Sequence, residues 1–91
     1  MYTNNTPKVS IIIACLNVEN TIKKTIESII NQDYNNIEIV IIDGKSKDGT
    51  LNVLKSFEKK IYKIVSEKDK SLGDAWNKGL LITTGEIIGI L

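Results

Sequence analysis

The stretch IEIVIIDGKSKDG at residues 37–49 decides the fold class of this 91-residue chain. Its apolar, mostly β-branched run Ile37–Ile42 indicates a strand. The run stops at Asp43, and a polar loop that contains Gly44 and Gly49 follows. A buried strand that ends in such a loop is typical of α/β domains, in which loops at strand ends carry the ligand groups.

Segments of similar character flank this stretch on both sides. Val9–Cys15 is nearly continuous in β-branched residues, as expected of a strand buried on both faces of a parallel sheet. Between the two strands, isoleucines at residues 22–30 recur with the spacing of one helix face, and Asn20 or Thr21 can cap the helix start. The later segments continue the alternation: a helix with Leu51, Leu54 and Phe57, a strand at Ile61–Val65, a helix from about Gly73 to Thr83 and a strand at Glu86–Leu91.

This β-α-β-α-β-α-β order predicts a Rossmann-like open parallel sheet with right-handed crossovers. The last strand is still apolar at residue 91, so we interpret the chain as a partial domain. Residues 1–7 are expected to form a flexible tail, and residues 8–91 the folded portion.

The third helix carries an unusual glycine. We expect Ala75, Trp76 and Leu80 to face inward. Gly79 weakens a helix by roughly 1 kcal/mol relative to alanine, which indicates close packing or a backbone approach at that position. Gly85 is expected to end the helix as a C-terminal glycine.

The composition is that of an ordinary globular domain. Hydrophobic residues make up 42% and charged residues 25%, and the net charge of +1 indicates neither nucleic acid nor a membrane surface as a partner. Every basic residue is Lys, so the chain offers no guanidinium for phosphate and no imidazole for acid–base chemistry. A Ser-His-Asp triad, a Cys-His pair and a His-ligated zinc are therefore excluded within these residues.

A cytoplasmic location is expected. The single Cys15 cannot form an internal disulfide, which suits a reducing compartment. Met1–Lys8 is polar and shows no signal-peptide pattern, and the longest apolar runs are too short to cross a bilayer.

Ligands of open parallel sheets bind beyond the carboxyl ends of the strands. That rule selects three loops: Cys15–Glu19, Asp43–Asp48 and Ser66–Asp74. At the tip of its strand, Asp43 is placed to accept hydrogen bonds from a uracil N3–H or from ribose hydroxyls, or else to cap the next helix. Asp48 is the better candidate for that cap.

Other polar residues near the strand ends allow two interpretations each. Asn17 and Glu19 can hydrogen-bond a base or ribose, or can begin a helix. Asp74 lies in a first helical turn, where the helix dipole alone accounts for an acid, and a lone Trp76 at helical spacing is more often a core residue.

Four charged loop residues are equally open. Lys45 and Lys47 can approach a diphosphate as point charges, or can be solvated. Glu67 and Asp69 are paired acids in a loop, for which a solvated turn is at least as good an interpretation. Sharper signals are missing: the chain has no G-x-G-x-x-G after the first strand, no P-loop and no Cys/His cluster.

Three segments in order resemble the family 2 glycosyltransferases of the GT-A fold. Residues 9–22 are similar to the family's opening strand and its Asn-x-Glu turn. Residues 37–50 are similar to its strand–Asp–small–Ser–x–Asp-Gly-Thr pattern. Residues 66–88 resemble the Ser-Glu-x-Asp and Asp-Ala-x-Asn-Lys-Gly branch found in bacterial polysaccharide enzymes.

The resemblance implies a nucleotide-diphospho-sugar donor, often a UDP-sugar, and usually inversion at the sugar carbon. It implies that residues 8–91 are the N-terminal nucleotide-binding portion of a GT-A domain in which Asp43 contacts the base. Ala14, Asn17 and Glu19 would line the nucleoside pocket, and Asp74 and Trp76 would border it. The acceptor would be a sugar or a lipid-linked sugar, and the parent protein could associate with a membrane.

The chain departs from the family pattern at several positions. Ala14, Cys15 and Leu16 stand where proline and an aromatic residue are common, Lys45 and Lys47 replace smaller or acidic residues, Ser71 occupies a usual glycine, and Gly73 often has a bulkier residue. The family's Asp-x-Asp metal motif and general base would follow Leu91, so the Mn²⁺ or Mg²⁺ ligands are expected outside this chain. These residues alone are therefore expected to be inactive.

Two rival functions remain at this point. The first is a non-catalytic nucleotide-binding or scaffold module of the same fold, which an Asp-x-Asp motif after Leu91 would argue against. The second is a nucleotidyltransferase, which usually needs a loop with Gly and Arg after the first strand. Residues 16–21 have neither.

Overall fold

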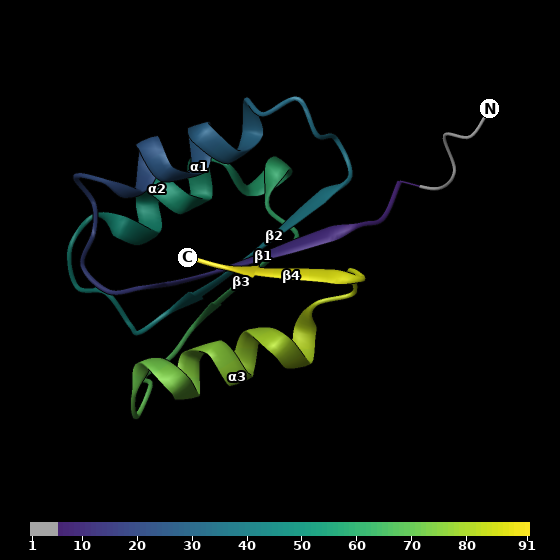
Figure 1. The fold of residues 1–91 in the computed structure, drawn as a ribbon. Helices are drawn as coiled ribbons and strands as arrows, with labels where there is room; N and C mark the ends of the chain where they lie inside the picture. Colours follow the sequence, from purple (N-terminus) through teal and green to yellow (C-terminus); the bar gives the residue numbers. More distant parts are fainter. Residues whose placement is uncertain (1–5) are drawn as a thin grey trace.

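The computed structural model of the chain describes residues 6–91, so most of the predicted tail, residues 1–5, lies outside the described part. Within it, strands and helices alternate as predicted (Figure 1). The elements are β1 (Val9–Cys15), α1 (Ile22–Ile30), β2 (Ile37–Asp43), α2 (Thr50–Ser56), the 3-10 helix η2 (Glu58–Lys60), β3 (Lys63–Ser66), α3 (Leu72–Ile82) and β4 (Ile87–Ile90).

The four strands form one sheet in the order β3-β2-β1-β4, and all of its strand pairs are parallel. Helices α1 and α2 cover one face of this sheet and α3 covers the other (Figure 1). The chain thus builds outward from β1 to β3 and then crosses back to place β4 on the far side of β1. This matches the predicted Rossmann-like open parallel sheet, and the order of strands reverses at β1.

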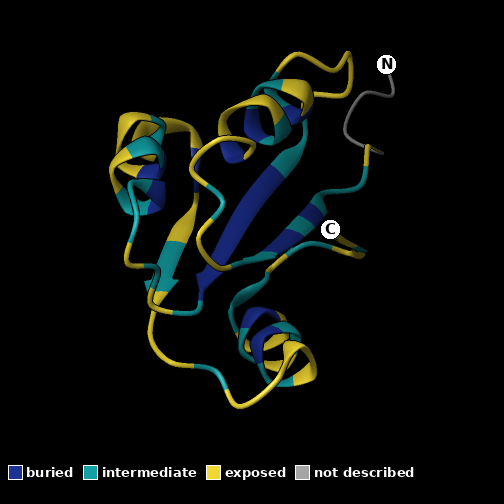
Figure 2. Ribbon diagram, turned by 90° about the vertical axis from the view of Figure 1, so that its left-hand side faces the viewer, coloured by how far each residue is buried: buried dark blue, intermediate teal, exposed yellow. Residues whose placement is uncertain are grey.

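Two apolar cores lie on opposite faces of the sheet. Alternate residues of β1 and β2 point to each face, so Ile13, Ile39 and Ile41 meet α1 and α2, whereas Ile12 and Val40 meet α3. Figure 2 shows the buried residues gathered along β2 and the inward sides of the helices, with β3 and β4 paler at the sheet edges. This two-sided burial accounts for the continuous apolar runs in the sequence.

The inward face of α3 differs from the prediction. Ala75 and Gly79 are buried and Ile82 packs against the core on this face of the sheet, at the i, i+4, i+7 spacing, whereas Leu80 is 46% exposed. A Cβ atom on Gly79 would lie 2.5 Å from Ile12 Cγ2, so the predicted close packing is confirmed. Glycine at this position lets α3 approach β1 directly.

A buried carboxylate, that of Glu38, lies at the amino-terminal ends of the central strands and links them to the segment before β4. Glu38 accepts hydrogen bonds from Ser10 Oγ (2.6 Å) and from Thr84 N and Oγ1 (2.6 and 2.8 Å), and Lys8 Nζ lies 3.7 Å away. Burial raises the pKa of Glu38, but these hydrogen bonds and the lysine outweigh it and hold the pKa below its usual value. Glu38 thereby joins β1, β2 and the turn before β4.

Gly85 does not act as the predicted helix-ending glycine. Helix α3 ends at Ile82, and no described glycine has a positive φ angle. Instead, a Cβ atom on Gly85 would lie 2.5 Å from Ser10 Oγ and 2.8 Å from the Lys8 carbonyl oxygen. Gly85 is needed because the turn before β4 lies directly against the start of β1.

The strand β3 begins two residues later than predicted. Ile61 is buried in the core, but it directly follows the 3-10 helix and does not pair with β2. The hydrogen-bonded pairing of β3 with β2 begins at Lys63, which lies opposite Val40. Helix α3 begins one residue earlier than predicted, because Ser71 Oγ accepts a hydrogen bond from Asp74 N and caps it.

Candidate functional site

The carboxyl ends of β1, β2 and β3 meet at one edge of the sheet around Asp43. This residue is fully buried. Its Oδ2 accepts hydrogen bonds from Ser46 N and Ser66 Oγ, both at 2.8 Å, and its Oδ1 accepts from Ser46 Oγ at 2.5 Å and from the Cys15 thiol at 3.6 Å. Asp43 therefore ties three strand ends together. Its predicted contact with a base stays a prediction, and here the carboxylate is satisfied by protein donors.

The thiol of Cys15 is held in its neutral form. Burial, followed by the charge of Asp43, raises the pKa of Cys15 from 9.0 to about 12. Because the thiolate is the reactive form of cysteine, the thiol is a weak hydrogen-bond donor here and not a nucleophile.

The first two loops are joined by hydrogen bonds between backbone and side chains. Asn17 N donates to Ser46 Oγ, and Lys47 N donates to Asn17 Oδ1, both at 2.8 Å. Asn17 and Lys45 hold positive φ angles of 52° and 68°, a conformation that asparagine tolerates better than lysine. The predicted site residue Asn17 thus shapes the edge of the site through its own amide.

A second pair of contacts extends this junction to α2. Val18 N donates to Thr50 Oγ1 (2.8 Å), and Glu19 N donates to Asp48 Oδ2 (3.3 Å). Asp48 also accepts from Thr50 N and Oγ1, and the hydrogen bond from the Thr50 hydroxyl holds the pKa of Asp48 below its usual value. The Glu19 carboxylate lies against Gly49, so Glu19 borders the loop junction.

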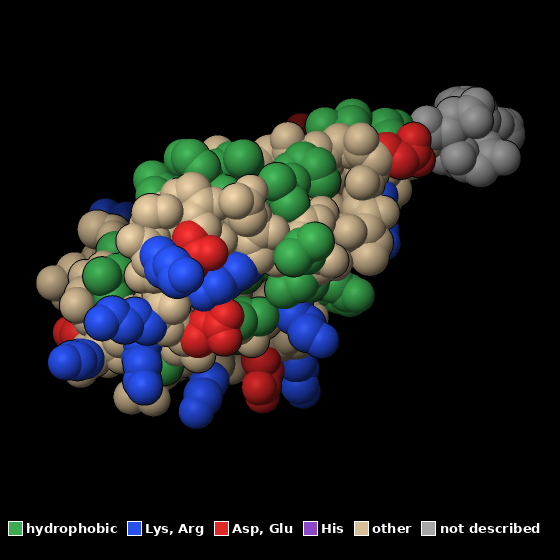
Figure 3. All heavy atoms as spheres, turned by 90° about the horizontal axis from the view of Figure 1, so that it is seen from below, with side chains coloured by type: hydrophobic (Ala, Val, Ile, Leu, Met, Phe, Trp, Pro, Cys, Tyr) green, Lys and Arg blue, Asp and Glu red, His purple; other side chains and the backbone are tan. Residues whose placement is uncertain are grey.

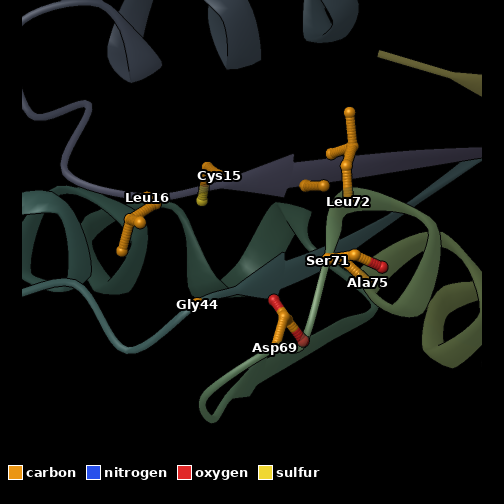
Figure 4. Close-up of a pocket in the computed structure, with 8 residues that line it drawn as sticks. Cys15, Leu16, Gly44, Asp69, Ser71, Leu72 and Ala75 are labelled. Atoms are coloured by element: carbon orange, nitrogen blue, oxygen red, sulfur yellow. The ribbon is translucent and has the colours of Figure 1, made fainter.

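A hollow of about 310 Å³ opens beside this junction, toward α3 (Figure 4). Its wall is mostly apolar, and its charged member is Asp69. The lining residues are Ala14, Cys15, Leu16, Gly44, Asp69, Ser71, Leu72 and Ala75. The hollow lies at the carboxyl ends of β1 and β2, where an open parallel sheet binds its ligands.

A second recess of about 470 Å³ adjoins the hollow and is basic. It shares Leu16 and Gly44 with the hollow and adds Lys45, Lys47 and Lys68. Among the described residues, no carboxylate forms an ion pair with any of these three lysines. The two cavities together present an apolar slot beside a positive field, which suits an apolar ring attached to an anionic group.

The structure separates the six residues predicted to bind substrate. Ala14 lines the hollow and Asn17 lines the basic recess, while Glu19 and Asp43 lie in the loop junction. Asp74 lies at the start of α3 and accepts from Lys70 N at 3.0 Å; this hydrogen bond is the main cause that holds its pKa below the usual value.

Trp76 packs against the core on the α3 face. It contacts the buried cluster that contains Ile12, Val40 and Ala75, and its Nε1 is buried without a hydrogen-bond partner. Of the two interpretations of Trp76 from the sequence, its position in the structure agrees with that of a core residue. It lies one residue beyond Ala75, which lines the hollow.

Sequence reasoning did not identify four residues of the wall on its α3 side. Asp69, Ser71, Leu72 and Ala75 line the hollow from the segment between β3 and α3. The paired acids at residues 67 and 69 and the helix start after them were the available signal. Spacing alone did not show that Asp69 turns inward.

Residues 6–91 contain no group of three or more His, Cys, Asp or Glu side chains arranged to hold a metal ion. The residues present thus do not fit a metal centre. In the same part of the chain, no helix combines the length and hydropathy needed to span a membrane.

Comparison with known proteins gives one consistent result. The family described as glycosyl transferase family 2 matches residues 10–91. The UDP-Glc:alpha-D-GlcNAc-diphosphoundecaprenol beta-1,3-glucosyltransferase WfaP of Escherichia coli is 39% identical over 84 residues, which cover 91% of this chain and 34% of that protein.

Two solved structures share the fold. Mannosyltransferase PcManGT from Pyrobaculum calidifontis, in complex with GDP-Man and Mn²⁺, superposes with a TM-score of 0.82 at 28% identity over 90% of this chain and 26% of its own. S. aureus TarS 1-349 in complex with UDP-GlcNAc gives 0.85 at 25% identity over 92% of this chain and 26% of its own. The chain spans 12% to 36% of the length of eight curated relatives that it matches, WfaP among them.

Proposed function

The chain belongs to glycosyl transferase family 2, and from this premise we propose that its protein transfers a sugar from a nucleotide-diphospho-sugar to an acceptor. The pathway we propose is the synthesis of a bacterial-type polysaccharide or glycoconjugate, and UDP is the proposed nucleotide. Residues 8–91 supply the part of the site that holds the nucleoside.

One observation carries this proposal: the apolar hollow and the lysine recess meet at Leu16 and Gly44, at the carboxyl edge of a parallel sheet. A base and ribose fit an apolar slot of about 310 Å³. Lys45, Lys47 and Lys68 lie beside this slot, and their positive field favours the approach of a polyanionic donor.

The proposed reaction is a direct displacement with inversion at the sugar carbon. A divalent ion, Mn²⁺ or Mg²⁺, would neutralise the leaving diphosphate. Its ligands, and the base that deprotonates the acceptor, are proposed to lie beyond residue 91, so this part of the chain binds and orients the nucleoside. The PcManGT complex with GDP-Man and Mn²⁺ supports the divalent ion.

We propose a lipid-linked sugar as the acceptor. The name of WfaP specifies a diphosphoundecaprenol acceptor, which supports this class. Such an acceptor would bring the protein to the cytoplasmic face of a membrane. A cytoplasmic site also agrees with the free thiol of Cys15.

The experiment is a donor screen on the complete natural polypeptide that contains these residues. UDP-, GDP- and dTDP-sugars are supplied with Mn²⁺ or Mg²⁺ and a lipid-diphosphate acceptor, and release of the nucleoside diphosphate is measured. Transfer from a UDP-sugar supports the proposal. Nucleotide binding without transfer to any acceptor would favour the non-catalytic module.

A substitution at the junction of the two cavities tests the location of the site. Leu16→Glu places a carboxylate where the hollow and the recess meet, so we expect the affinity for UDP to fall at least about tenfold through repulsion of the diphosphate. Leu81→Glu is the matched control, because Leu81 is 88% exposed on α3 and lines neither cavity. Equal losses in the two variants would place the nucleotide elsewhere.

A further inference from the structure

The net charge of +1 conceals an uneven distribution of charge along the chain and over its surface. Six of the twelve lysines lie in residues 55–70, together with three acids. Two of those acids, Glu67 and Asp69, form ion pairs with Lys78 of α3. Figure 3 shows basic side chains gathered mainly along the lower border of the molecule and hydrophobic side chains mainly above them. The segment is therefore a local source of positive charge.

Four of these lysines form what we call the basic patch: Lys55, Lys59, Lys60 and Lys63. All four are exposed, and none forms an ion pair with a carboxylate of residues 6–91. The first three line a recess of about 570 Å³ between the end of α1 and the segment from α2 to η2. The fourth begins β3. The patch thus continues from the recess onto the edge of the sheet.

Two acids share the recess with these lysines. Glu27 and Glu58 line it, but neither forms an ion pair with a described lysine. The helix dipole accounts for a lysine in the last turn of α2, such as Lys55, but not for Lys63, which begins a strand. Four lysines against two acids leave the patch positive.

The two edges of the sheet differ in character. The β4 edge exposes the apolar side chains of Ile87, Ile88 and Ile90. The β3 edge begins with Lys63, and a lysine on an edge strand discourages pairing with a strand of another chain. The β3 edge therefore suits a negatively charged surface better than the addition of a further strand.

We propose that the basic patch docks the protein on an anionic membrane surface. This inference rests on the proposed lipid-linked acceptor, which places a substrate in the membrane. Clusters of about four to eight basic residues are attracted to anionic lipid headgroups. Tyr62 lies between two lysines of the patch and is 53% exposed, and tyrosine side chains favour the level of the headgroups.

Strand β3 connects the basic patch to the candidate site. Lys63 begins the strand, and Ser66 at its end donates a hydrogen bond to Asp43. The rise from the first to the last residue of this strand is about 10 Å. Contact of the patch with headgroups holds the candidate site close to the membrane surface, where a lipid-linked sugar is presented.

The measurement is sedimentation of the complete natural polypeptide with phospholipid vesicles. We expect binding to vesicles with about one-third phosphatidylglycerol to exceed binding to pure phosphatidylcholine at least about tenfold. The binding should fall at least about tenfold in about 1 M salt, where the screening length is about 3 Å.

Substitutions in the patch test its role directly. Lys59→Gln combined with Lys60→Gln should lower binding to the anionic vesicles at least about tenfold, because each lysine near the surface contributes about fivefold. Lys55→Gln combined with Lys63→Gln should lower it by a similar factor. The affinity for UDP should stay unchanged in both double variants, because none of the four lysines lines the hollow or the lysine recess.

A matched control removes the same charge elsewhere. Lys23→Gln combined with Lys24→Gln alters two exposed lysines of α1 that lie outside the recess, so vesicle binding should stay within about twofold of the unmodified protein. Thermal unfolding checks that each variant is folded.

The other outcomes distinguish this inference from the proposed function. Undiminished vesicle binding in the patch variants, an equal loss in the control, or equal binding to both kinds of vesicle would overturn the docking surface and leave the glycosyltransferase proposal standing. Lysine-dependent binding to duplex RNA as tight as that to vesicles would overturn the membrane as the partner. Vesicle binding through the patch by a polypeptide that binds no nucleotide and transfers no sugar would overturn the proposed function and support the docking surface alone.

Discussion

Replacing Gly79 with alanine should destabilise the fold, although alanine is the better helix former. A Cβ atom at this position would lie 2.5, 3.1 and 3.2 Å from three carbon atoms of Ile12. Ile12 of β1 is fully buried against α3, and its β-branched side chain cannot rotate away without leaving its preferred rotamer. Either the side chain or the helix must therefore shift.

The magnitude follows from two opposing effects. Overpacking of a filled core costs about 1–3 kcal/mol. The gain in helix propensity from glycine to alanine is about 1 kcal/mol. Gly73→Ala, in the same helix, should show the propensity gain without the clash, because its nearest neighbour would be Ser71 Oγ at 3.8 Å. The difference between the two variants isolates the overpacking cost.

The assay is urea unfolding of both variants and the parent chain, followed by far-ultraviolet circular dichroism. With a urea slope of about 1 kcal/mol/M, Gly79→Ala should unfold at a midpoint about 1–3 M below that of Gly73→Ala. Equal midpoints, or a higher midpoint for Gly79→Ala, would refute the conclusion that glycine is required for the contact of α3 with β1.

Three further predictions follow from the buried contacts. Gly85→Ala should destabilise the chain by about 2–3 kcal/mol in urea unfolding, because its Cβ atom would meet Ser10 Oγ at 2.5 Å and backbone atoms that cannot rotate aside. The lowered pKa of Glu38 should stabilise the fold above the ordinary value of 4.5, and this stabilisation should be lost as the pH falls through the lower folded pKa; Glu38→Gln should weaken that acid dependence in titrations of stability. With its pKa raised from 9.0 to about 12, native Cys15 should react with iodoacetamide at pH 8 roughly a thousandfold more slowly than in urea.

Each of these predictions has its own control. Gly89→Ala, whose Cβ atom would meet the flexible end of Ile11 at 3.1 Å, should cost less than Gly85→Ala. Glu58→Gln alters an exposed acid and should leave the acid dependence unchanged. Alkylation of native Cys15 within tenfold of the unfolded rate would contradict the buried, neutral thiol.

Most of the fold could be predicted because its signals are local. The apolar runs of β1 and β2 and the isoleucine face of α1 each express burial in a repeating pattern that needs no knowledge of the neighbours. The fourth strand followed from the same reasoning. Gly79 could be interpreted because a glycine within a helix is costly unless something lies close to it.

The errors arose where tertiary contacts decide the outcome. Leu80 was expected inward, but the short distance from α3 to β1 is set at Gly79, and this turns Leu80 outward. Gly85 was assigned to a helix end, because the backbone of Lys8 is distant in sequence and its contact with the turn leaves no local pattern.

The three loops selected from the sequence surround the hollow, but the orientations of their side chains could not be predicted. The rule for parallel sheets located the three loops that surround the hollow. It could not show that serine hydroxyls at residues 46 and 66 turn Asp43 into the protein, or that Lys78 holds Asp69 against the opening. Both depend on side chains from other elements.

The hydrogen bonds that link residues 17–19 to residues 46–50 have a kinetic consequence. Four backbone N–H groups and side-chain acceptors from the two segments already hold each other in place. A ligand would therefore bind to residues 17–19 and 46–50 in the conformation that they already hold, and its binding would not need to order these two segments. Its observed association rate should then rise in proportion to its concentration, without the plateau that a preceding or following rearrangement imposes.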